Sequence, residues 1–270
     1  MLGIHQSFTG LQDLIVDANE IGADTFQFFI RNNRNLKMRK FQNVEFDYFN
    51  HLLMQSDIDT YVLHASYSIN PASDEDAKRA NAVHMIKEDM RVLSHLGGKV
   101  KYVLHPGSAV GALRTVAFYN LVDTITQVIK HVPLNVSICL EYMAGQGTQL
   151  LTSPNEIKAI HSMLRNYPQV QYCFDTAHVY ESGYDLDTAM GLLELEVGLS
   201  RIGVMHINNS ATIKGSHVDR HAPINSGKIP SEELVDFTRK YMRMLPDVPF
   251  ILETPADSLI DDYKYLKQFC

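Results

Sequence analysis

Six apolar stretches of this chain each end at a side chain that can bind a metal ion. They are residues 61–64, 100–105, 135–141, 170–175, 202–206 and 248–253, and they end at His64, His105, Glu141, Asp175, His206 and Glu253. Short, nearly continuous apolar runs are typical of strands buried on both faces of a parallel sheet. When such a sheet closes, the carboxyl ends of its strands meet at one rim, where (β/α)₈ barrels carry their active sites. The pattern therefore predicts a barrel with a metal-centred rim.

Strand-like and helix-like segments alternate along the whole chain. Residues 2–5 and 25–30 add two strands to the six, and an amphipathic helical pattern follows each strand. An open, doubly wound sheet is the main alternative, but it usually has a glycine-rich first turn. Here that turn reads QSFTG and lacks this fingerprint. We therefore expect an α/β fold, a (β/α)₈ TIM barrel that forms a single catalytic domain over residues 1–270.

Composition limits the environment in which the protein is expected to work. No run approaches eighteen apolar residues, so no membrane span is expected. The first strand begins at Leu2, which leaves no room for a signal peptide. The three cysteines have no C-x-x-C spacing, and Cys139 and Cys173 lie inside apolar runs, where buried thiols are expected. These features predict a soluble protein of a reducing, intracellular compartment.

The charge distribution does not decide whether the chain binds nucleic acid. Its net charge of −7 argues against such binding, since nucleic-acid binders are usually basic. Bound divalent cations would offset most of that charge, however, and residues 31–40 carry five basic residues and no acid. A charge run of this kind is most often a solvated loop or helix face. Both interpretations stay open on charge alone.

Three further donors raise the number of metal-binding candidates to nine. His178 follows Asp175 in D-T-A-H, and Asp219 and His221 stand two residues apart in V-D-R-H, on one side of an extended segment. One catalytic metal typically uses three protein ligands and water, so nine donors indicate two or three metals. Imidazole with carboxylate suits zinc or manganese. Any one of these side chains alone would more often be an ordinary polar residue. His5 ends the first strand, where a role as a further ligand and a role in supporting the ligands from behind are equally compatible with the sequence.

The motifs around these donors resemble those of the endonuclease IV family of apurinic/apyrimidinic endonucleases. The similarity extends from His5 to Glu253 and is carried by HPGS at 105–108, EYMAGQG at 141–147, FDTAH at 174–178, GYDL at 183–186, MHIN at 205–208, VDRH at 218–221 and ILET at 251–254. The resemblance implies a trinuclear zinc centre, with manganese possible at one site. The implied ligands are His64, His105 and Glu141 for the first metal, the bridging Glu141 with Asp175, His206 and Glu253 for the second, and His178, Asp219 and His221 for the third.

The same resemblance implies the reaction and the partner. Members of this family cleave the phosphodiester on the 5′ side of an abasic site during base excision repair and leave a 3′-hydroxyl and a 5′-deoxyribose phosphate. Glu141 and Glu253 would then be catalytic, and the partner would be double-stranded DNA that contains an abasic site. The residues expected to contact DNA are Arg34, Asn35, Lys37 and Tyr67. We expect the protein to act as a monomer.

Two other functions compete with this one. A sugar isomerase or epimerase on a related barrel uses a single metal, for which Glu141, Asp175, His206 and Glu253 would be enough. Such an enzyme would not need the three loop donors or an acid-free basic segment. A non-catalytic protein that binds damaged DNA is the second alternative, but it has no use for nine metal donors. The nuclease is therefore the preferred hypothesis.

Overall fold

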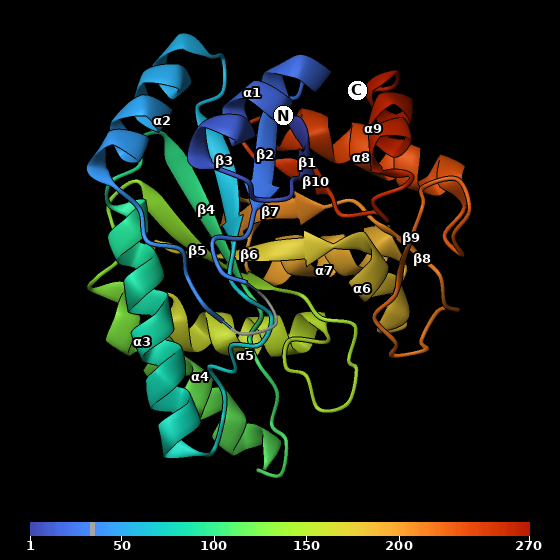
Figure 1. Ribbon diagram of the computed structural model, residues 1–270. Coiled ribbons are helices and arrows are strands. Elements are labelled where there is room, and N and C mark those ends of the chain that lie inside the picture. The colour runs from blue at the N-terminus through green and yellow to red at the C-terminus, as the bar shows by residue number, and fades with distance from the viewer. Residues whose placement is uncertain (33–35) are drawn as a thin grey trace.

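Eight parallel strands form a closed barrel in the computed structural model, which describes residues 1–32 and 36–270. Their order around the barrel is β1-β10-β7-β6-β5-β4-β3-β2, and the pairing of β1 with β2 closes it (Figure 1). The strands are β1 (Leu2–His5), β2 (Thr25–Phe28), β3 (Thr60–His64), β4 (Lys99–Leu104), β5 (Val136–Glu141), β6 (Val170–Asp175), β7 (Ile202–His206) and β10 (Phe250–Leu252). The predicted single-domain TIM barrel is confirmed.

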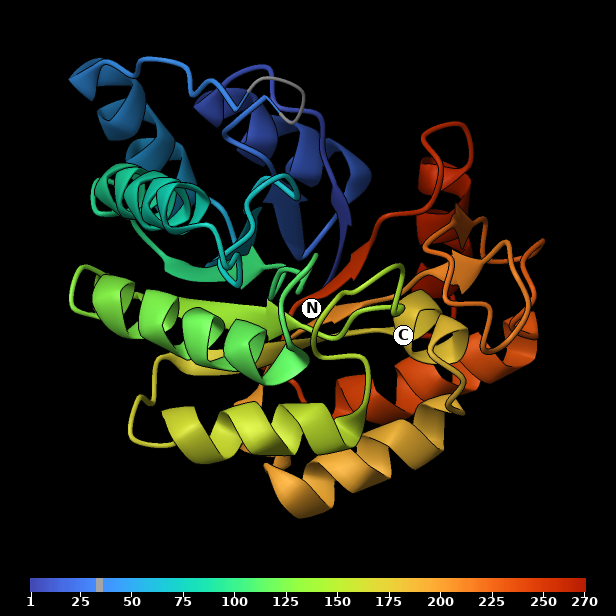
Figure 2. The ribbon, with the colours of Figure 1, turned by 90° about the horizontal axis from the view of Figure 1, so that it is seen from below.

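Helices cover the outside of the barrel, as the second view shows (Figure 2). They are α1 (Leu11–Ile21), α2 (Asn43–Gln55), α3 (Asp76–Leu93), α4 (Arg114–Ile129), α5 (Pro154–Leu164), α6 (Thr176–Glu181), α7 (Leu186–Glu196), α8 (Ser231–Met244) and α9 (Leu259–Lys267), with a 3₁₀ turn at Leu199–Arg201. Among the described residues, no helix is long and apolar enough to cross a membrane.

The structure adds two elements where the sequence indicated only loops. Helix α6 begins immediately after β6, because the Asp175 carboxylate caps it by accepting the His178 backbone N–H at 3.0 Å. Within residues 208–230, β8 (Asn209–Ser210) pairs with β9 (His221–Ala222) in a short antiparallel ribbon. Both elements carry a predicted metal donor, His178 in α6 and His221 in β9.

The barrel interior explains how the strands place these donors. Six strands contribute one fully buried apolar residue each to an inner cluster, namely Val62, Val103, Cys139, Cys173, Val204 and Ile251. The predicted donor of each strand follows two residues later. Because side chains alternate in direction along a strand, the donors lie on the same inward face, one layer nearer the rim. The apolar layer thus forms the floor of the site. Both interior cysteines are free and buried, as predicted.

A buried polar network fixes the start of the basic segment after β2. Arg31 is only 6% exposed, and its Nε donates to Asp89 Oδ1 of α3 at 2.7 Å. The Tyr102 hydroxyl donates to the other oxygen of Asp89 at 2.7 Å, and Arg31 also contacts Glu88 at 3.1 Å. Arg31 therefore serves as an anchor between the loop and the barrel, and it is not part of a solvated basic face.

We expect Asp89→Ala to lower the free energy of unfolding by about 3 kcal/mol, because it leaves the buried Arg31 without its main carboxylate partner. Urea denaturation followed by circular dichroism measures the change. Glu88→Ala is the matched control, since Glu88 is more exposed, and it should cost less than about 1 kcal/mol. Equal losses in the two variants would show that the Asp89 contact does not anchor the loop.

Candidate metal centre

The carboxylate of Glu141 lies at the centre of the rim, and its two oxygens face different groups of donors. Oε2 lies 3.2 Å from Nε2 of His64 and 3.1 Å from Nε2 of His105. Oε1 lies 3.1 Å from Nδ1 of His206, which in turn lies 3.1 Å from Oε2 of Glu253. A carboxylate shared in this way between two donor groups is the arrangement that a bridging metal ligand requires.

Both donor groups match sets that were expected to share a metal. The ligand atoms of His64, His105 and Glu141 lie within 4.8 Å of one another. The same holds for the group made by Glu141, Asp175, His206 and Glu253. These residues come from β3, β5, β6 and β7 and from the residues just after β4 and β10, so the closed sheet alone brings them together.

The third predicted group, His178, Asp219 and His221, lies where α6 meets the 208–222 segment. Its ligand atoms fall into two overlapping sets within 4.8 Å, one of Asp175, His178 and His221 and one of His178, Glu181 and Asp219. Nε2 of His178 lies 3.3 Å from Oδ2 of Asp219, and Nε2 of His221 lies 3.8 Å from Oδ1 of Asp219. Asp175 links this group to the barrel, since its Oδ2 lies 3.7 Å from Nε2 of His221. His178 is buried because it lies on the first turn of α6, whereas Asp219 and His221 keep partial access to solvent.

The electrostatics of the cluster favour added positive charge. Burial disfavours the charged form of Glu141, yet His105 and His206 hold the pKa of its carboxyl well below the usual range. Burial also opposes charge on His178, yet Asp175 and Asp219 hold the pKa of its imidazole well above the usual range. Protonated imidazoles thus supply positive charge that stabilises the buried carboxylates. The Nε2 atoms of His178 and His221 are nevertheless buried without a hydrogen-bond partner among the described residues. These imidazole nitrogens and carboxylate oxygens fit a divalent cation that prefers nitrogen and oxygen ligands.

Two amide side chains that the sequence did not single out hold the donors in place. The Gln27 amide nitrogen donates to Glu253 Oε1 at 2.5 Å, and its oxygen lies 2.8 Å from His206 Nε2. The Asn208 amide nitrogen donates to Asp175 Oδ2 at 2.8 Å, and its oxygen accepts the Glu253 backbone N–H at 2.8 Å. A polar residue within the apolar run 25–30 was the only signal for Gln27.

His5 lies beside Gln27 and Glu253 and lines two of the pockets at the rim. Its Nδ1 lies 2.9 Å from the Gln27 amide nitrogen and 3.6 Å from Glu253 Oε1. Burial lowers the pKa of His5 to about 4, so the imidazole is neutral at pH 7. A neutral ring can orient the Gln27 and Glu253 side chains without adding charge.

The residues expected to contact DNA lie around the same rim as far as they are described. Tyr67 is 55% exposed and meets Phe29 edge to face. Lys37 is exposed on the loop after β2. Arg34 and Asn35 fall outside the described residues. A DNA-contacting role for these four side chains remains a prediction.

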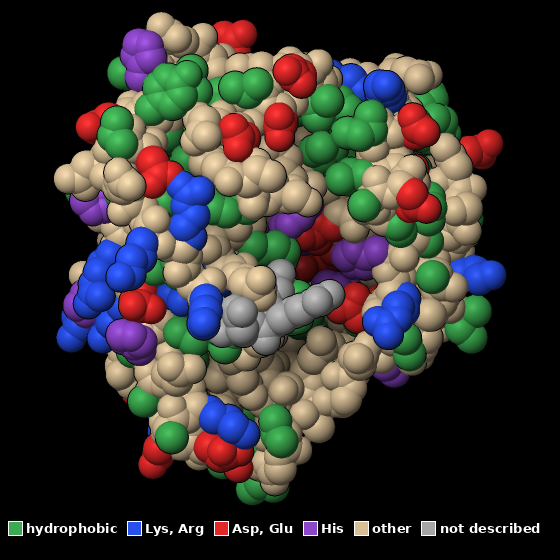
Figure 3. Space-filling view, viewed as in Figure 1, with side chains coloured by type: hydrophobic (Ala, Val, Ile, Leu, Met, Phe, Trp, Pro, Cys, Tyr) green, Lys and Arg blue, Asp and Glu red, His purple; other side chains and the backbone are tan. Residues whose placement is uncertain are grey.

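Three adjoining pockets lead from the donors to the flank of the barrel. The first, of about 310 Å³, is lined by His221, Glu253, His5 and Phe29. The second, of about 440 Å³, shares His5 and Phe29 with the first. The third, of about 750 Å³, shares three basic residues with the second: Arg31, Lys37 and Arg39. In Figure 3, acidic and histidine side chains line the central hollow, and lysine and arginine side chains gather on the surface to its left.

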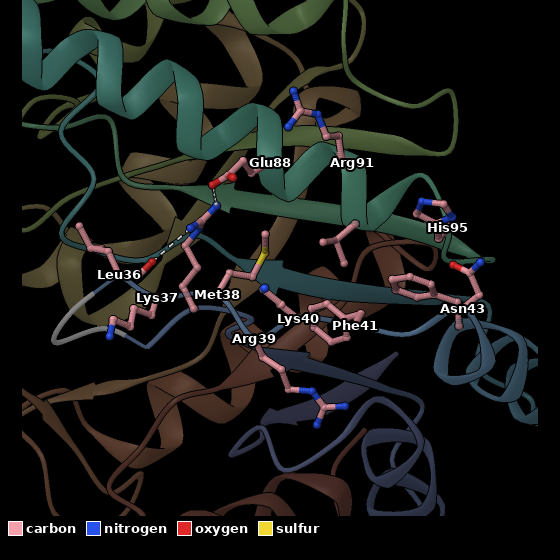
Figure 4. A pocket seen from close by; sticks show the side chains of 13 residues that line it. Leu36, Lys37, Met38, Arg39, Lys40, Phe41, Asn43, Glu88, Arg91 and His95 are labelled. Atoms are coloured by element: carbon pink, nitrogen blue, oxygen red, sulfur yellow. Dashed lines mark hydrogen bonds and ion pairs between the residues drawn. The ribbon is translucent and has the colours of Figure 1, made fainter.

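The outermost pocket is basic and aromatic. The loop after β2 supplies Lys40 and Phe41 on one side, and α3 and the residues after it supply Arg91 and His95 on the other (Figure 4). Lys40 and Arg91 have no ion pair with any described residue, whereas Arg39 pairs with Glu45. Although the chain has a net charge of −7, Lys40 and Arg91 thus place two cations without an ion pair to any described residue in the outermost pocket.

Known proteins resemble this chain over almost its entire length. Residues 15–269 match the family model of the xylose isomerase-like TIM barrels. A probable endonuclease 4 of Methanosphaera stadtmanae is 32% identical over 97% of this chain and 95% of its own length. A probable endonuclease 4 of Finegoldia magna is 35% identical over 97% of this chain and 93% of its own length.

Solved structures agree with these relatives. Endonuclease IV from Thermus thermophilus superposes with a TM-score of 0.86 and 27% identity, covering 99% of this chain and 98% of that one. A D-tagatose 3-epimerase-like protein superposes with a TM-score of 0.74, but its 16% identity shows a common fold only. The nearly full-length match to relatives above 30% identity places this chain in the endonuclease IV family of xylose isomerase-like TIM barrels.

Proposed function

We propose that this protein is a metal-dependent DNA repair endonuclease that hydrolyses the phosphodiester on the 5′ side of an abasic site. The products would be a 3′-hydroxyl and a 5′-deoxyribose phosphate. The observation that carries the proposal is the position of Glu141, whose two oxygens face separate donor groups at the rim of a barrel of the endonuclease IV family. A substrate of double-stranded DNA agrees with the basic groove that begins at this rim.

The nine donors would hold three Zn²⁺ ions, with Mn²⁺ as an alternative at one position. His64, His105 and Glu141 would hold one ion, Glu141 with Asp175, His206 and Glu253 the second, and His178, Asp219 and His221 the third. Bound divalent cations lower the pKa of water to about 7 and neutralise charge on a phosphate. All nine side chains end in nitrogen or oxygen, which suits this choice of metal.

The side chains of the rim divide into buried and accessible members. Glu141, Asp175 and His206 are fully buried and fix the geometry from below. Glu253 is 16% exposed and Asp219 is 32% exposed, so these carboxylates can meet a phosphate that enters from solvent. Hydrolysis joins the hydroxyl of a water to phosphorus and breaks the bond to the 3′-oxygen, which leaves with a proton. We assign Glu253 as the base that accepts the proton of the attacking water. The Gln27 amide and the Asn208 side chain hold Glu253 in place.

Recognition of the damage would rest on the exposed rim and the groove. An abasic nucleotide has lost its base, so turning its sugar out of the helix costs less than turning out an intact nucleotide. Tyr67 could then stack where the base is missing, which is worth about 1–3 kcal/mol for an aromatic side chain on a base. The cations of Lys37, Lys40 and Arg91 would contact phosphates on the flank, which fixes the position of the duplex without reading its sequence.

A single-metal sugar epimerase is the second function that the fold allows. It would use only Glu141, Asp175, His206 and Glu253. The convergence of His178, Asp219 and His221 beside this set favours the nuclease, because those three donors have no part in a single-metal reaction.

We expect Glu141→Gln to lower the rate of nicking by at least about 100-fold, a typical cost of losing a side chain that stabilises the transition state. The substrate is a duplex with one abasic-site analogue, and gel electrophoresis of a labelled strand reports the nick. A chelator should abolish the wild-type activity and Zn²⁺ should restore it. Glu232→Gln, an exposed carboxylate on α8, is the control and should keep full activity. No nick by the zinc-loaded wild type, or an equal nick by Glu141→Gln, would contradict the proposal.

We expect the double variant Lys40→Gln, Arg91→Gln to bind an uncleavable abasic duplex more weakly, with a smaller salt dependence. Each lost phosphate contact should reduce the slope of log K against log salt by about 0.9. Fluorescence anisotropy at several salt concentrations measures the slope. Lys130→Gln with Arg165→Gln removes the same charge after α4 and α5, and should leave the slope unchanged. If both double variants show the wild-type affinity and salt dependence, the groove does not bind DNA.

A further inference from the structure

Glu181 is a buried acid that the proposed mechanism does not use. It is the last residue of α6, one helical turn after His178, and its side chain is fully buried. A buried carboxylate is costly unless it is paired, hydrogen-bonded or bound to a metal. The contacts of its two oxygens therefore show how much of that cost the protein offsets by itself.

One oxygen of Glu181 is well satisfied by the segment that follows β7. Oε1 accepts the Ser210 hydroxyl at 2.7 Å and the Arg220 backbone N–H at 3.2 Å. The Thr212 hydroxyl lies 3.4 Å from the same oxygen. Glu181 thus holds together the two ends of the loop that carries Asp219.

The other oxygen has no such role. Oε2 of Glu181 is buried and makes no hydrogen bond with the described part of the chain. A buried polar atom without a partner typically costs about 1–3 kcal/mol. This second oxygen needs a partner that the protein side chains do not supply.

The neighbours of Glu181 are two of the predicted metal donors. A carboxylate oxygen of Glu181 and the ligand atoms of His178 and Asp219 lie within 4.8 Å of one another. Nε2 of His178 also lacks a hydrogen bond to any described residue. Glu181, which has one buried oxygen without a hydrogen bond, therefore belongs to the same group as His178 and the partly exposed Asp219.

We propose that Glu181 is an additional ligand of the divalent cation held by His178, Asp219 and His221. The inference rests on the proposed function, since it takes from it the cation at this position. Glu181 would add a fourth protein donor and a second negative charge from the protein interior. Asp219 lies on a loop, whereas Glu181 and His178 lie three residues apart on α6, so the helix would supply two of the ligands.

The test compares Glu181→Gln with the wild type in binding of Zn²⁺ alone. Glutamine keeps an oxygen that can accept from Ser210 and Arg220, but it loses the charge and the free oxygen. We expect the wild type to hold three Zn²⁺ ions, and the variant to bind one of them at least about tenfold more weakly, as for altered residues near a metal. Competition with a chromophoric chelator measures each affinity, and metal analysis after dialysis gives the number bound.

Ser210→Ala separates the ligand role from the loop contact. It removes a donor to Oε1 and leaves the charge, so it should keep all three ions at wild-type affinity. Melting of the metal-free proteins checks that each variant is folded. Equal zinc affinities for Glu181→Gln and wild type would overturn the inference, as would an equal loss in Ser210→Ala. A wild type that holds fewer than three ions would overturn the trinuclear centre itself.

Discussion

Four carboxylates, those of Glu141, Asp175, Asp219 and Glu253, lie together at the carboxyl end of the barrel among five imidazoles. Burying so much negative charge is unfavourable unless positive charge is brought close. In the protein alone, the imidazoles supply it, as the raised pKa of His178 shows. Divalent cations would supply it more fully. The need to balance this charge explains the imidazoles and the two amides that surround these carboxylates.

The barrel beneath this site makes the electrostatics effective. The inner layer of apolar side chains excludes water from below, so the interactions of Glu141 and His206 act in a medium of low dielectric constant. The Gln27 amide donates to Glu253 Oε1, and the Asn208 amide donates to the Asp175 oxygen that also faces His206 and His221. Pre-organised donors of this kind do not have to rearrange when a phosphate enters. The open side of the cluster adjoins the basic groove, because neighbouring pockets share His5 and Phe29.

Periodicity and order along the chain were enough to predict the barrel and the convergence of its donors. Each of the six strand-end donors stands two residues after an interior apolar residue, so the alternation of side chains along a strand places it on the same inward face. The pattern along the chain could not predict contacts between side chains of different strands. Gln27 and Asn208 are amides, which are not typical zinc ligands, and their importance depends on neighbours from other strands. Glu181 lies on a helix that the sequence did not indicate. Arg31 looked like part of a solvated basic run, but Asp89, far along the chain, buries it.

The most direct test of the central claim is a crystal structure of the zinc-loaded protein with anomalous diffraction measured at the zinc edge. Our account predicts three peaks, one between His64, His105 and Glu141, a second between Glu141, Asp175, His206 and Glu253, and a third at His178, Asp219 and His221. A single peak at the second position, with the loop donors unbound, would contradict the account and would favour a single-metal sugar enzyme instead.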